Sequence, residues 1–481
     1  MAKRVGVIDL GSNSARLAIF ERTSRLGFYV MGEFKTKVRL GEGAYENGGV
    51  LTDQAMDKCF AAFSQFREIT KRYKVNKILC VGTSALRDAP NGGIFIKRVR
   101  KELRLNLRAI DGEKEAYYGA MAVSNLLCDL DEFVTIDIGG GSTELAKVQN
   151  GKIIGKISLN IGTVRLKELF FDKGDFKNLD KFTQNLISQI PEEFKSQNLV
   201  TIGGSLRAIA SAIMEKTDYP LKILHNFEYN LDEFTGYIMQ IASSSITTLS
   251  RFPIKKDRYD TIREGAYIFL KVADYLGAKK AYVSGVGVRE GVFLDNLLGT
   301  NAKFPSNFNP SLKSLQDRFC VGETKKLPKY AKAIFMALSP LHNIDEKFLP
   351  LLMDATKVVN SGVAIDYYER HINSAYLAIS TLNYGYTHTQ KALISAIIRI
   401  NGKKITDDVK EYKRLLPDDE TLIWLSFVLK LAQQLDALNS DDLGFSYDNH
   451  TLFISGAKND IIIKNEIKKM LKPGVFAINF I

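Results

Sequence analysis

The sequence is poor in cysteine, proline and long apolar runs, and each shortage argues against a class of protein. Its four cysteines form no CxxC pair, so neither a zinc site nor a disulfide framework is indicated. Only 11 prolines occur, which argues against long disordered linkers. The longest uncharged run, residues 372–390, is interrupted by Asn, His and Gln and disfavours a membrane span. The first residues show no apolar signal-peptide core, so we expect a cytoplasmic protein.

What the sequence does contain is typical of a globular protein with a basic surplus. Its 481 residues suggest roughly three domains. Lys and Arg number 66 against 54 Asp and Glu, a net charge of +12, which favours a polyanionic partner such as nucleic acid, a phospholipid surface or polyphosphate. The sequence shows no zinc-finger, RRM or KH signature and no basic tail. We therefore expect no specific nucleic acid partner, and assign the charge to a groove in the folded body.

Residues 133–146, FVTIDIGGGSTELA, predict a buried strand that ends in a glycine turn. Asp137 lies near the end of the strand, and the turn that follows consists of Gly139, Gly140, Gly141, Ser142, Thr143 and then Glu144. Backbone N–H groups in such a turn can approach an anion closely and form a binding nest. The nearby carboxylates can hold a Mg²⁺ that binds phosphate. Taken alone, the stretch would also suit an ordinary tight hairpin.

A second copy of this pattern lies at residues 5–18, VGVIDLGSNSARLA. At one constant offset, Asp9 matches Asp137, Gly11 matches Gly139 and Ser14 matches Ser142, with Ser12 and Asn13 inside the turn. The chain thus carries strand, Asp, glycine turn and strand twice. We interpret the repeat as two phosphate loops that face each other across one cleft, with Asp9 and Asp137 on opposite walls.

Further elements follow from periodicity and capping signals. We expect helices over residues 53–73, 110–125, 164–170 and 180–193, and a helix over 97–108 would align Arg100, Arg104 and Arg108 on one face. Strands are expected at 15–20, 27–37, 77–81, 144–148, 153–159, 199–202 and 281–283. The last two run into glycine turns, which place backbone donors where α/β folds bind phosphate.

A shift to Asn, Pro and Ser near residues 299–310 indicates a linker. The pattern beyond it is helical almost to the end, with strands expected at 452–463 and 475–481. We therefore divide the chain into domains at 1–125, 126–300 and 310–481.

Four sequence motifs, which follow one another along the chain, together resemble a known family. VIDLGSNS (7–14), GTSALR (82–87), DGEKEAYYG (111–119) and IDIGGGSTE (136–144) together closely resemble the exopolyphosphatase / guanosine pentaphosphate phosphohydrolase family, a branch of the actin-like ATPase-fold superfamily. The resemblance covers residues 1–300 well and the remainder loosely. It implies an α/β fold with two duplicated actin-like (ribonuclease H-like) domains around a cleft, followed by a mostly helical domain.

The resemblance also implies residue roles. Glu115 matches the catalytic Glu, Arg87 matches a phosphate-contacting Arg, and Asp9, Asp137 and Glu144 match carboxylates that hold Mg²⁺ or Mn²⁺. Hydrolysis of a phosphoanhydride requires positioning and charge neutralisation more than covalent chemistry, and these residue types supply both. One conflict is visible in the sequence, since a carboxylate in the first turn of a helix is stabilised in its charged form and is a weaker base. Burial or a neighbouring acid would have to raise its pKa.

The C-terminal third departs from the family pattern. Relatives often carry a helical region that resembles HD phosphohydrolases, whose metal site needs adjacent His-Asp or His-Glu residues. Here the five histidines are followed by Asn, Asn, Ile, Thr and Thr, and Val359-Asn360 stands where a pair is expected. We interpret this domain as a degenerate HD domain with a structural or substrate-guiding role.

Three function classes follow from these observations. The first is a magnesium-dependent exopolyphosphatase that also accepts the 5′-γ-phosphate of guanosine pentaphosphate. The second is another actin-fold ATPase or sugar kinase, and the third is a non-catalytic regulator that binds guanosine tetra- or pentaphosphate. Intact Glu115, Asp137 and Glu144 favour catalysis. Substrate preference and oligomeric state, including a homodimer, stay open.

Overall fold

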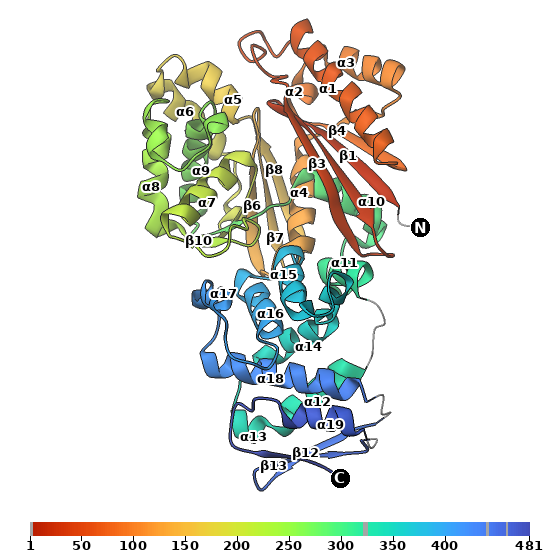
Figure 1. The fold of residues 1–481 in the computed structure, drawn as a ribbon. Coiled ribbons are helices and arrows are strands. Elements are labelled where there is room, and N and C mark those ends of the chain that lie inside the picture. Colours follow the sequence, from red (N-terminus) through yellow and green to blue (C-terminus); the bar gives the residue numbers. More distant parts are fainter. Residues whose placement is uncertain (1–2, 321–325, 439–441, 458–459) are drawn as a thin grey trace. The chain divides into compact units, whose positions relative to one another are not determined.

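The computed structural model describes residues 3–320, 326–438, 442–457 and 460–481. The chain divides into two compact units, Met1–Phe308 and Asn309–Ile481. The first unit contains two β-sheets with their helices, and the second is mainly helical (Figure 1). The further division of the first unit at residues 125–126 stays a prediction.

The first sheet is built from five strands in the order β3-β2-β1-β4-β5. The strands are β1 (Arg4–Leu10), β2 (Ser14–Arg22), β3 (Phe28–Lys37), β4 (Lys77–Gly82) and β5 (Leu107–Ala109). The strands β1, β2 and β3 form an antiparallel meander, and β4 and β5 continue the sheet in parallel with β1. Val7 and Ile8 of the central strand β1 have no exposed surface, as expected for a strand covered on both faces.

The second sheet repeats this topology and adds one strand at its edge. It contains β6 (Glu132–Ile138), β7 (Thr143–Gln149), β8 (Lys152–Leu159), β9 (Asn198–Ile202), β10 (Glu228–Asn230) and β11 (Lys280–Val283). The order β8-β7-β6-β9-β11 has the same directions as the five strands of the first sheet, and β10 pairs antiparallel to β11. The structure therefore confirms the duplication predicted from residues 5–18 and 133–146.

Helices cover both sheets. They are α1 (Asp53–Arg72), α2 (Ser84–Asp88), α3 (Gly92–Arg98), α4 (Gly112–Leu126), α5 (Thr163–Leu166), α6 (Phe176–Ile187), α7 (Gly204–Lys216), α8 (Leu231–Ser243), α9 (Ile262–Leu276) and α10 (Val288–Leu298). Figure 1 shows α4 and α10 between the two sheets. Although α4 follows the first sheet in the chain, it contacts β7 and β8, and α10 contacts β1. This exchange of helices joins the two halves of the unit.

Aromatic stacking fixes α10 on the first sheet. The ring of Phe293 in α10 stacks on Phe20 of β2, with their centroids 4.2 Å apart, and tilts against Phe28 of β3 at 4.8 Å. All three side chains are essentially buried, and such ring pairs add stabilisation beyond the area that they bury. The packing holds the start of α10 close to the end of β1, where Asp9 lies.

Two predictions in the first unit are wrong. The helix expected over 97–108 ends at Leu103, because α3 passes into a π-helix, Val99–Leu103, and Arg104 takes a left-handed conformation at φ 56°. Arg108 then lies in β5, so the three arginines do not share a helical face. The helix expected at 180–193 is α6, which begins four residues earlier, where the side chain of Asp175 accepts from the N–H of Asn178, and ends before Pro191.

The C-terminal unit is built around α18 (Asp419–Asp436), whose Trp424, Phe427 and Leu431 are buried. The other helices are α11 (Pro310–Phe319), α12 (Lys326–Ala337), α13 (Ser339–His342), α14 (Leu349–Val358), α15 (Arg370–Thr381), α16 (His388–Ile400), α17 (Asp407–Lys410) and α19 (Ile461–Lys468). A three-stranded sheet of β12 (Gly444–Asp448), β13 (Thr451–Ser455) and β14 (Ala477–Phe480) completes the unit.

The strand expected at 452–463 is too long. Strand β13 ends at Ser455 because Gly456 turns the chain at φ 77°, and the side chain of Asp460 then caps a helix by accepting from the N–H of Ile463. The expected strand at 475–481 is present as β14, and β12 was not predicted. Across the described ranges, no helix combines the length and apolar character that crossing a membrane requires.

Candidate active site

The two glycine loops have the same internal geometry. The N–H of Gly11 donates to the carbonyl of Ser14 at 3.1 Å, and the N–H of Gly139 donates to the carbonyl of Ser142 at 3.0 Å. The loops also touch, since a Cβ on Gly140 would lie only 2.9 Å from the Cβ of Ser12. A side chain at this position would push the loops apart, which explains the need for glycine.

Both loops line one pocket in the first unit, as the repeat predicts. From the first copy the lining residues are Asp9, Gly11, Ser12 and Asn13, and from the second they are Asp137, Gly139, Gly140, Gly141 and Ser142. Glu115 also lines this pocket. Four predicted site residues are not in the lining: Ser14, Thr143, Arg87 and Glu144. The hydroxyl of Thr143 donates to the carbonyl of Ile161 at 2.6 Å, which gives it a structural role in the loop.

Four arginines that the sequence analysis did not assign to the site also line the pocket: Arg16, Arg207, Arg258 and Arg289. In the strand register, Arg16 lies opposite Asp9, just as Glu144 lies opposite Asp137 in the second copy. The repeat therefore places Arg16 at the position equivalent to Glu144, and this signal was present in the sequence. The other three come from α7, from the 3₁₀ turn Lys256–Arg258 and from α10, far apart in sequence.

These four arginines concentrate positive charge in the lining of the pocket. Burial lowers the pKa of Arg207 to about 10, and the neighbouring Arg16 and Arg289 act in the same direction. Arg207 Nη1 donates to the carbonyl of Ser284 at 3.1 Å, and Arg289 Nη1 donates to Glu33 Oε1 at 2.9 Å. A cluster of guanidinium groups beside two glycine loops is suited to an anion with several phosphate oxygens.

Glu115 reaches the pocket from the first turn of α4. The side chain of Asp111 caps this helix by accepting from the N–H of Lys114 at 2.6 Å. Helix α4 can lie against β8 because residue 112 is glycine, where a Cβ would come within 2.2 Å of the Cβ of Ser158. The side chain of Glu113 is exposed, and its Oε2 lies 3.5 Å from Nζ of Lys156. Glu115, in contrast, is only 8% exposed. The two acids of the first turn therefore have different surroundings.

The electrostatics of Glu115 resolve the conflict noted in the sequence. Burial, followed by repulsion from Glu144 and Asp137, raises the pKa of Glu115 well above its ordinary value, and Arg87 acts in the opposite direction. The pKa is therefore raised despite the position at the start of a helix. A carboxylate of raised pKa is a better proton acceptor near neutral pH.

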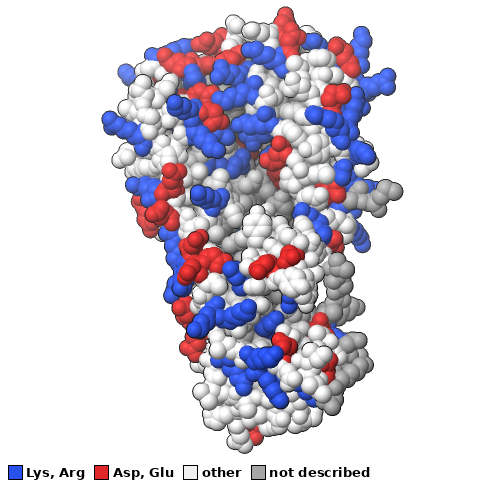
Figure 2. All heavy atoms as spheres, in the orientation of Figure 1, with Lys and Arg blue, Asp and Glu red and all other residues white. Residues whose placement is uncertain are grey.

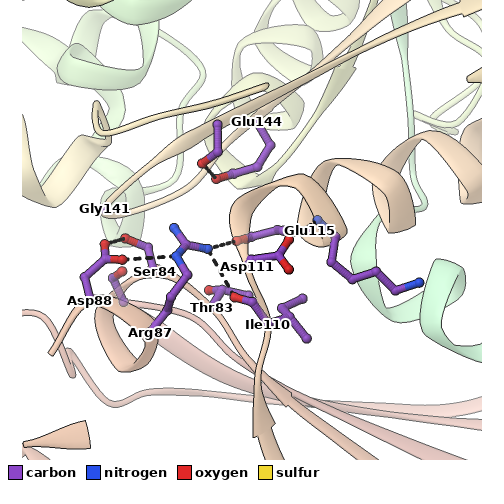
Figure 3. A network of polar contacts seen from close by, with 12 residues as sticks. Thr83, Ser84, Arg87, Asp88, Ile110, Asp111, Glu115, Gly141 and Glu144 are labelled. Carbon is purple, nitrogen blue, oxygen red and sulfur yellow. Dashed lines mark hydrogen bonds and ion pairs between the residues drawn. The ribbon is translucent and has the colours of Figure 1, made fainter. Parts of the chain in front are cut away.

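Arg87 binds Glu115 directly, as Figure 3 shows. Its Nη1 donates to Glu115 Oε2 at 3.0 Å and to the carbonyl of Ile110 at 3.4 Å, while its Nε donates to Asp88 Oδ1 at 3.0 Å. The guanidinium is thus held at two of its edges, by Glu115 and by Asp88, and Arg87 is not among the residues that line the pocket.

Glu144 lies close to Glu115 but deeper in the protein (Figure 3). It is 1% exposed, its Oε1 accepts from the hydroxyl of Ser158 at 2.8 Å, and its Oε2 is buried without a hydrogen-bond partner. Burial raises the pKa of Glu144 to about 7. An unpartnered buried carboxylate oxygen is costly, and Oε2 is free to accept from a water or to bind a cation.

A chain of contacts ties the two loops together at the pocket's edge. Tyr45 donates its hydroxyl hydrogen to Ser12 Oγ at 3.2 Å, and the guanidinium of Arg165 lies 4.5 Å from the centroid of the Tyr45 ring. Arg165 Nε donates to the carbonyl of Gly141 at 2.8 Å, and its Nη2 lies 3.7 Å from Asp88 Oδ2. Residues outside both glycine motifs therefore set the distance between the loops.

The buried carboxylates Asp9, Asp137 and Glu144 are suited to a cation that oxygens of the substrate also bind. Burial raises the pKa of Asp9 above its ordinary value and that of Asp137 to about 6, so these acids gain stability from a nearby positive charge. No group of three His, Cys, Asp or Glu side chains close enough to hold a metal occurs in the described parts of the chain. Mg²⁺ commonly binds one or two carboxylates together with phosphate and water, and Asp9, Asp137 and Glu144 Oε2 are the candidates for those one or two carboxylates.

The C-terminal unit has a neutral contact where an HD metal pair is expected. Gln433 Nε2 of α18 donates to Asn360 Oδ1 at 2.6 Å. The amide side chain of Asn360 is not an ionic ligand of the kind that such a site needs.

Comparisons with known proteins agree with the fold. The Ppx/GppA phosphatase family matches residues 18–300. Over 97% of its length the chain is 27% identical to a guanosine-5′-triphosphate,3′-diphosphate pyrophosphatase of Pseudoalteromonas translucida, of which it covers 95%. It is 32% identical to a bifunctional 3-dehydroquinate synthase/phosphatase of Fusobacterium nucleatum over 58% of this chain and 44% of that protein.

Two solved structures show the same fold for the part that they match. A Ppx/GppA family member of Aquifex aeolicus is 27% identical, with a TM-score of 0.53, and the match covers 63% of this chain and 99% of that one. An exopolyphosphatase from Cytophaga hutchinsonii is 24% identical, with a TM-score of 0.56 and coverage of 63% and 100%, and supports the fold alone. With two glycine loops, a buried Glu and this family match, the chain belongs to the Ppx/GppA phosphatase family and is a phosphatase acting on phosphoanhydrides.

Proposed function

We propose that this protein is an exopolyphosphatase that removes the terminal phosphate from inorganic polyphosphate, and that the same site accepts the terminal 5′-phosphate of guanosine pentaphosphate. The observation that carries the proposal is the position of Glu115. It is buried, has a raised pKa, and lines the pocket that both glycine loops also line. This arrangement suits a general base beside an anchored phosphate.

The proposed reaction is a hydrolysis with one proton transfer to the protein. Glu115 accepts a proton from a water molecule, and the water oxygen forms a bond to the terminal phosphorus. The bond between that phosphorus and the bridging oxygen breaks, and the bridging oxygen leaves on the shortened chain. Free phosphate and a chain one unit shorter are the products. The pKa of Glu115, raised by burial, supports its role as the proton acceptor.

The loops and the arginines would hold the phosphate chain during this step. The turns at Gly11 and at Gly139–Gly141 line the pocket and offer backbone N–H groups, while Arg16, Arg207, Arg258 and Arg289 supply positive charge. Fixed donors placed around a phosphoryl group stabilise the charge that spreads over its oxygens as the bond breaks.

Asp9, Asp137 and Glu144 would hold Mg²⁺ or Mn²⁺ in this proposal. When bound, the cation supplies charge neutralisation at the phosphate oxygens. Its binding would also relieve the repulsion among the carboxyl groups of the pocket, whose pKa values burial and mutual repulsion raise.

One relative and the net charge point to two different substrates. The full-length relative from Pseudoalteromonas is named for guanosine-5′-triphosphate,3′-diphosphate, and the net charge of +12 favours a long polyanion. The deciding experiment measures phosphate release from long-chain polyphosphate and from guanosine pentaphosphate, with and without Mg²⁺. Release from neither substrate, with binding of guanosine tetra- or pentaphosphate retained, would favour a non-catalytic regulator. Formation of ADP from ATP only when a sugar is present, without free phosphate, would favour a kinase.

A further inference from the structure

One buried histidine of the first unit lies outside the pocket lining and yet is joined to the pocket by hydrogen bonds. His225 precedes β10, in a turn in which the N–H of Phe227 donates to the carbonyl of Leu224 at 3.1 Å. Its side chain is buried, and it is not among the residues that line the pocket. Its ring nitrogens bind two parts of the chain that are far apart in sequence, at Leu126 and at Gly285.

The two ring nitrogens of His225 have fixed roles. The N–H of Gly285 donates to His225 Nδ1 at 3.0 Å. Because a backbone N–H can only donate, Nδ1 must accept and carries no hydrogen. The hydrogen of the neutral ring therefore lies on Nε2, which donates to the carbonyl of Leu126 at 2.8 Å. Only this neutral tautomer makes both bonds.

The peptide unit between Ser284 and Gly285 joins His225 to an arginine of the pocket. The N–H of this peptide donates to His225, and its carbonyl accepts from Arg207 Nη1 at 3.1 Å. The bond to His225 thus fixes the direction of the carbonyl, since the two groups belong to one rigid plane. Rotation of this peptide would take the acceptor away from Arg207.

The two partners of His225 belong to segments that carry site residues. Gly285 begins the turn that leads to Arg289 at the start of α10, and both residues line the pocket. This turn packs closely on the histidine, because a Cβ on Gly285 would lie 3.0 Å from the Cβ of His225. Leu126 is the last residue of α4, the helix that carries Glu115. His225 therefore connects the helix of the proposed base with the turn that leads to α10.

The backbone of the histidine's turn is held by other bonds. Asn226 Oδ1 accepts from the N–H of Cys128 at 2.9 Å, and the N–H of Asn226 donates to the carbonyl of Val283 at 2.9 Å. The N–H of Val283 in turn donates to the carbonyl of Phe227 at 2.8 Å. The turn should therefore keep its place when the side chain of residue 225 is changed.

Substrate binding depends on the pocket's own arginines, because the surface carries charges of both signs. Figure 2 shows Lys and Arg side chains interspersed with Asp and Glu over the face that it draws. Within the pocket, Arg16 and Arg289 repel Arg207, so the orientation of Arg207 needs an anchor such as the carbonyl of Ser284.

We propose that His225 is a positioning residue for the phosphatase reaction, and that it holds Arg207, through the Ser284–Gly285 peptide, in the orientation that binds substrate phosphate. It rests on the proposed function in one respect, the assignment of Arg207 to the phosphate chain. His225 itself touches neither the substrate nor the reacting atoms in this proposal.

Two variants break the two bonds of the ring one at a time. In His225→Asn the side-chain oxygen takes the place of Nδ1 and accepts from Gly285, whereas in His225→Gln the amide nitrogen takes the place of Nε2 and donates to Leu126. Each variant loses one buried hydrogen bond, so urea unfolding should show similar losses of stability. We expect His225→Gln to lower kcat/KM about tenfold or more, mainly by raising KM, and His225→Asn to stay within about threefold of wild type. Equal losses of activity in both variants would overturn the proposal.

His342 offers a matched control in the C-terminal unit, which contributes no residue to the pocket lining. Its Nδ1 accepts from the N–H of Ile344 at 2.9 Å, and its Nε2 lies 2.9 Å from the carbonyl of Phe335. His342→Gln therefore breaks the same kind of bond as His225→Gln, and kcat/KM should stay within about twofold of wild type. A loss of activity as large as that of His225→Gln would show a general effect of destabilisation and would overturn the proposal.

A double-mutant cycle tests whether His225 acts through Arg207. Arg207→Met removes the charge and should raise KM. Adding His225→Gln to this variant should change kcat/KM by less than about twofold, because residues that act as one unit have non-additive effects. The same fold-change from His225→Gln with and without Arg207 would overturn the proposal.

The cycle also separates failure of this inference from failure of the proposed function. A raised KM in Arg207→Met but not in His225→Gln would overturn the role of His225 alone. If wild type cleaves neither polyphosphate nor guanosine pentaphosphate, the proposed function fails, and the affinity for inorganic triphosphate, measured by calorimetry with EDTA, replaces kcat/KM in the same cycle. Absent triphosphate binding, or equal affinity in all variants, would then overturn the role of His225 as well.

The tautomer provides a test if His225→Gln does not fold. Full-length wild-type protein labelled with ¹⁵N at its five histidines is measured by NMR, and the signal of His225 is the one that His225→Asn removes. We expect a neutral ring with its hydrogen on Nε2 at pH 7. A hydrogen on Nδ1 would overturn the proposal, because that nitrogen could not accept from Gly285.

Discussion

Arg87 donates from Nη1 to Glu115 Oε2 across 3.0 Å, and this bond opposes the burial that raises the pKa of Glu115. The two residues come from the ends of different elements, α2 and α4. The guanidinium also binds Asp88 and the carbonyl of Ile110, so its position is fixed independently of Glu115. A base held by such a partner keeps its carboxylate in one orientation. For proton transfer from a positioned water, this fixed orientation matters more than the highest possible pKa of the base.

Replacing Glu115 by Gln should lower kcat by about 10²–10⁴-fold, the usual effect of losing a positioned general base. Binding of the phosphate chain should change little, because the glycine loops and arginines that line the pocket are intact. Steady-state phosphate release and calorimetric binding without turnover measure the two quantities. Activity within a few-fold of wild type would reject Glu115 as the base.

Replacing Arg87 by Lys separates two roles for this residue. If Arg87 contacts substrate phosphate, as the family resemblance implies, KM should rise. If it orients Glu115, as its contacts and its position outside the pocket lining suggest, kcat should fall about tenfold or more while KM stays near wild type, since lysine lacks the planar donors that bind Glu115 and Asp88 at once. A rise in KM with kcat unchanged would support the phosphate contact.

Replacing Asp137 by Asn or Glu144 by Gln should raise the Mg²⁺ concentration needed for half-maximal activity. Each change removes a hard anionic oxygen from the residues proposed to hold the cation. Glu264→Gln is the matched control, because Glu264 is also a fully buried carboxylate of the first unit but does not line the pocket. An unchanged Mg²⁺ requirement in both test variants would show that other groups hold the ion.

The repeat let the sequence predict the centre of the fold. Alternating apolar residues and a shared Asp-Gly pattern placed the four strands β1, β2, β6 and β7, and the structure confirms them with the same register at both loops. The expected helix over 110–125 is present as α4, which begins at Gly112 after its cap Asp111. These signals are local, so a single sequence contains them.

The parts that sequence did not predict depend on long-range packing. Arg207, Arg258 and Arg289 reach the pocket only because α7, a 3₁₀ turn and α10 converge there, and no spacing in the chain relates them. The 97–108 stretch has helical spacing, but pairing of β5 with β4 overrides it after Arg104. The sequence showed that Glu144 follows the second glycine turn. Its hydrogen bond with Ser158 and its burial are seen only in the structure.

A chain ending at Phe308, the end of the first unit, should keep cleavage of short substrates and bind long polyphosphate more weakly. Long polyphosphate carries about one charge per unit, so contacts along its length release counterions and make binding steeply dependent on salt. Loss of the contacts that the C-terminal unit makes with the chain should make that dependence shallower. The family relative from Aquifex aeolicus, whose whole chain corresponds to 63% of this one, supports folding of the shortened protein.

Circular dichroism and thermal unfolding must first show that the shortened chain is folded. KM for long polyphosphate is then measured from 50 to 300 mM salt beside the full-length protein, and guanosine pentaphosphate serves as the short substrate. An unchanged KM and salt slope in a folded shortened chain would rule out a role for the C-terminal unit in holding long chains.

Glu264 should make the first unit less stable at alkaline pH. Its carboxylate is fully buried in α9, neither oxygen has a hydrogen-bond partner, and the nearest cation, Arg263 Nη2, lies 3.6 Å from Oε1. Burial raises the pKa of Glu264 from 4.5 to about 7. Because the folded state holds this proton more tightly than the unfolded state, its contribution to stability is greatest below pH 4.5, falls between pH 4.5 and 7, and is lowest above pH 7.

The variant Glu264→Gln removes this titration while keeping the size of the side chain. We expect it to be more stable than wild type at pH 8, by an amount on the order of 3 kcal/mol for a shift of this size, and the difference should shrink steadily toward pH 5. Urea unfolding of full-length protein at several pH values measures it, with Glu193→Gln as the exposed control. A stability difference of the same size at pH 5 and pH 8 would show that the charge of Glu264 is not its cause.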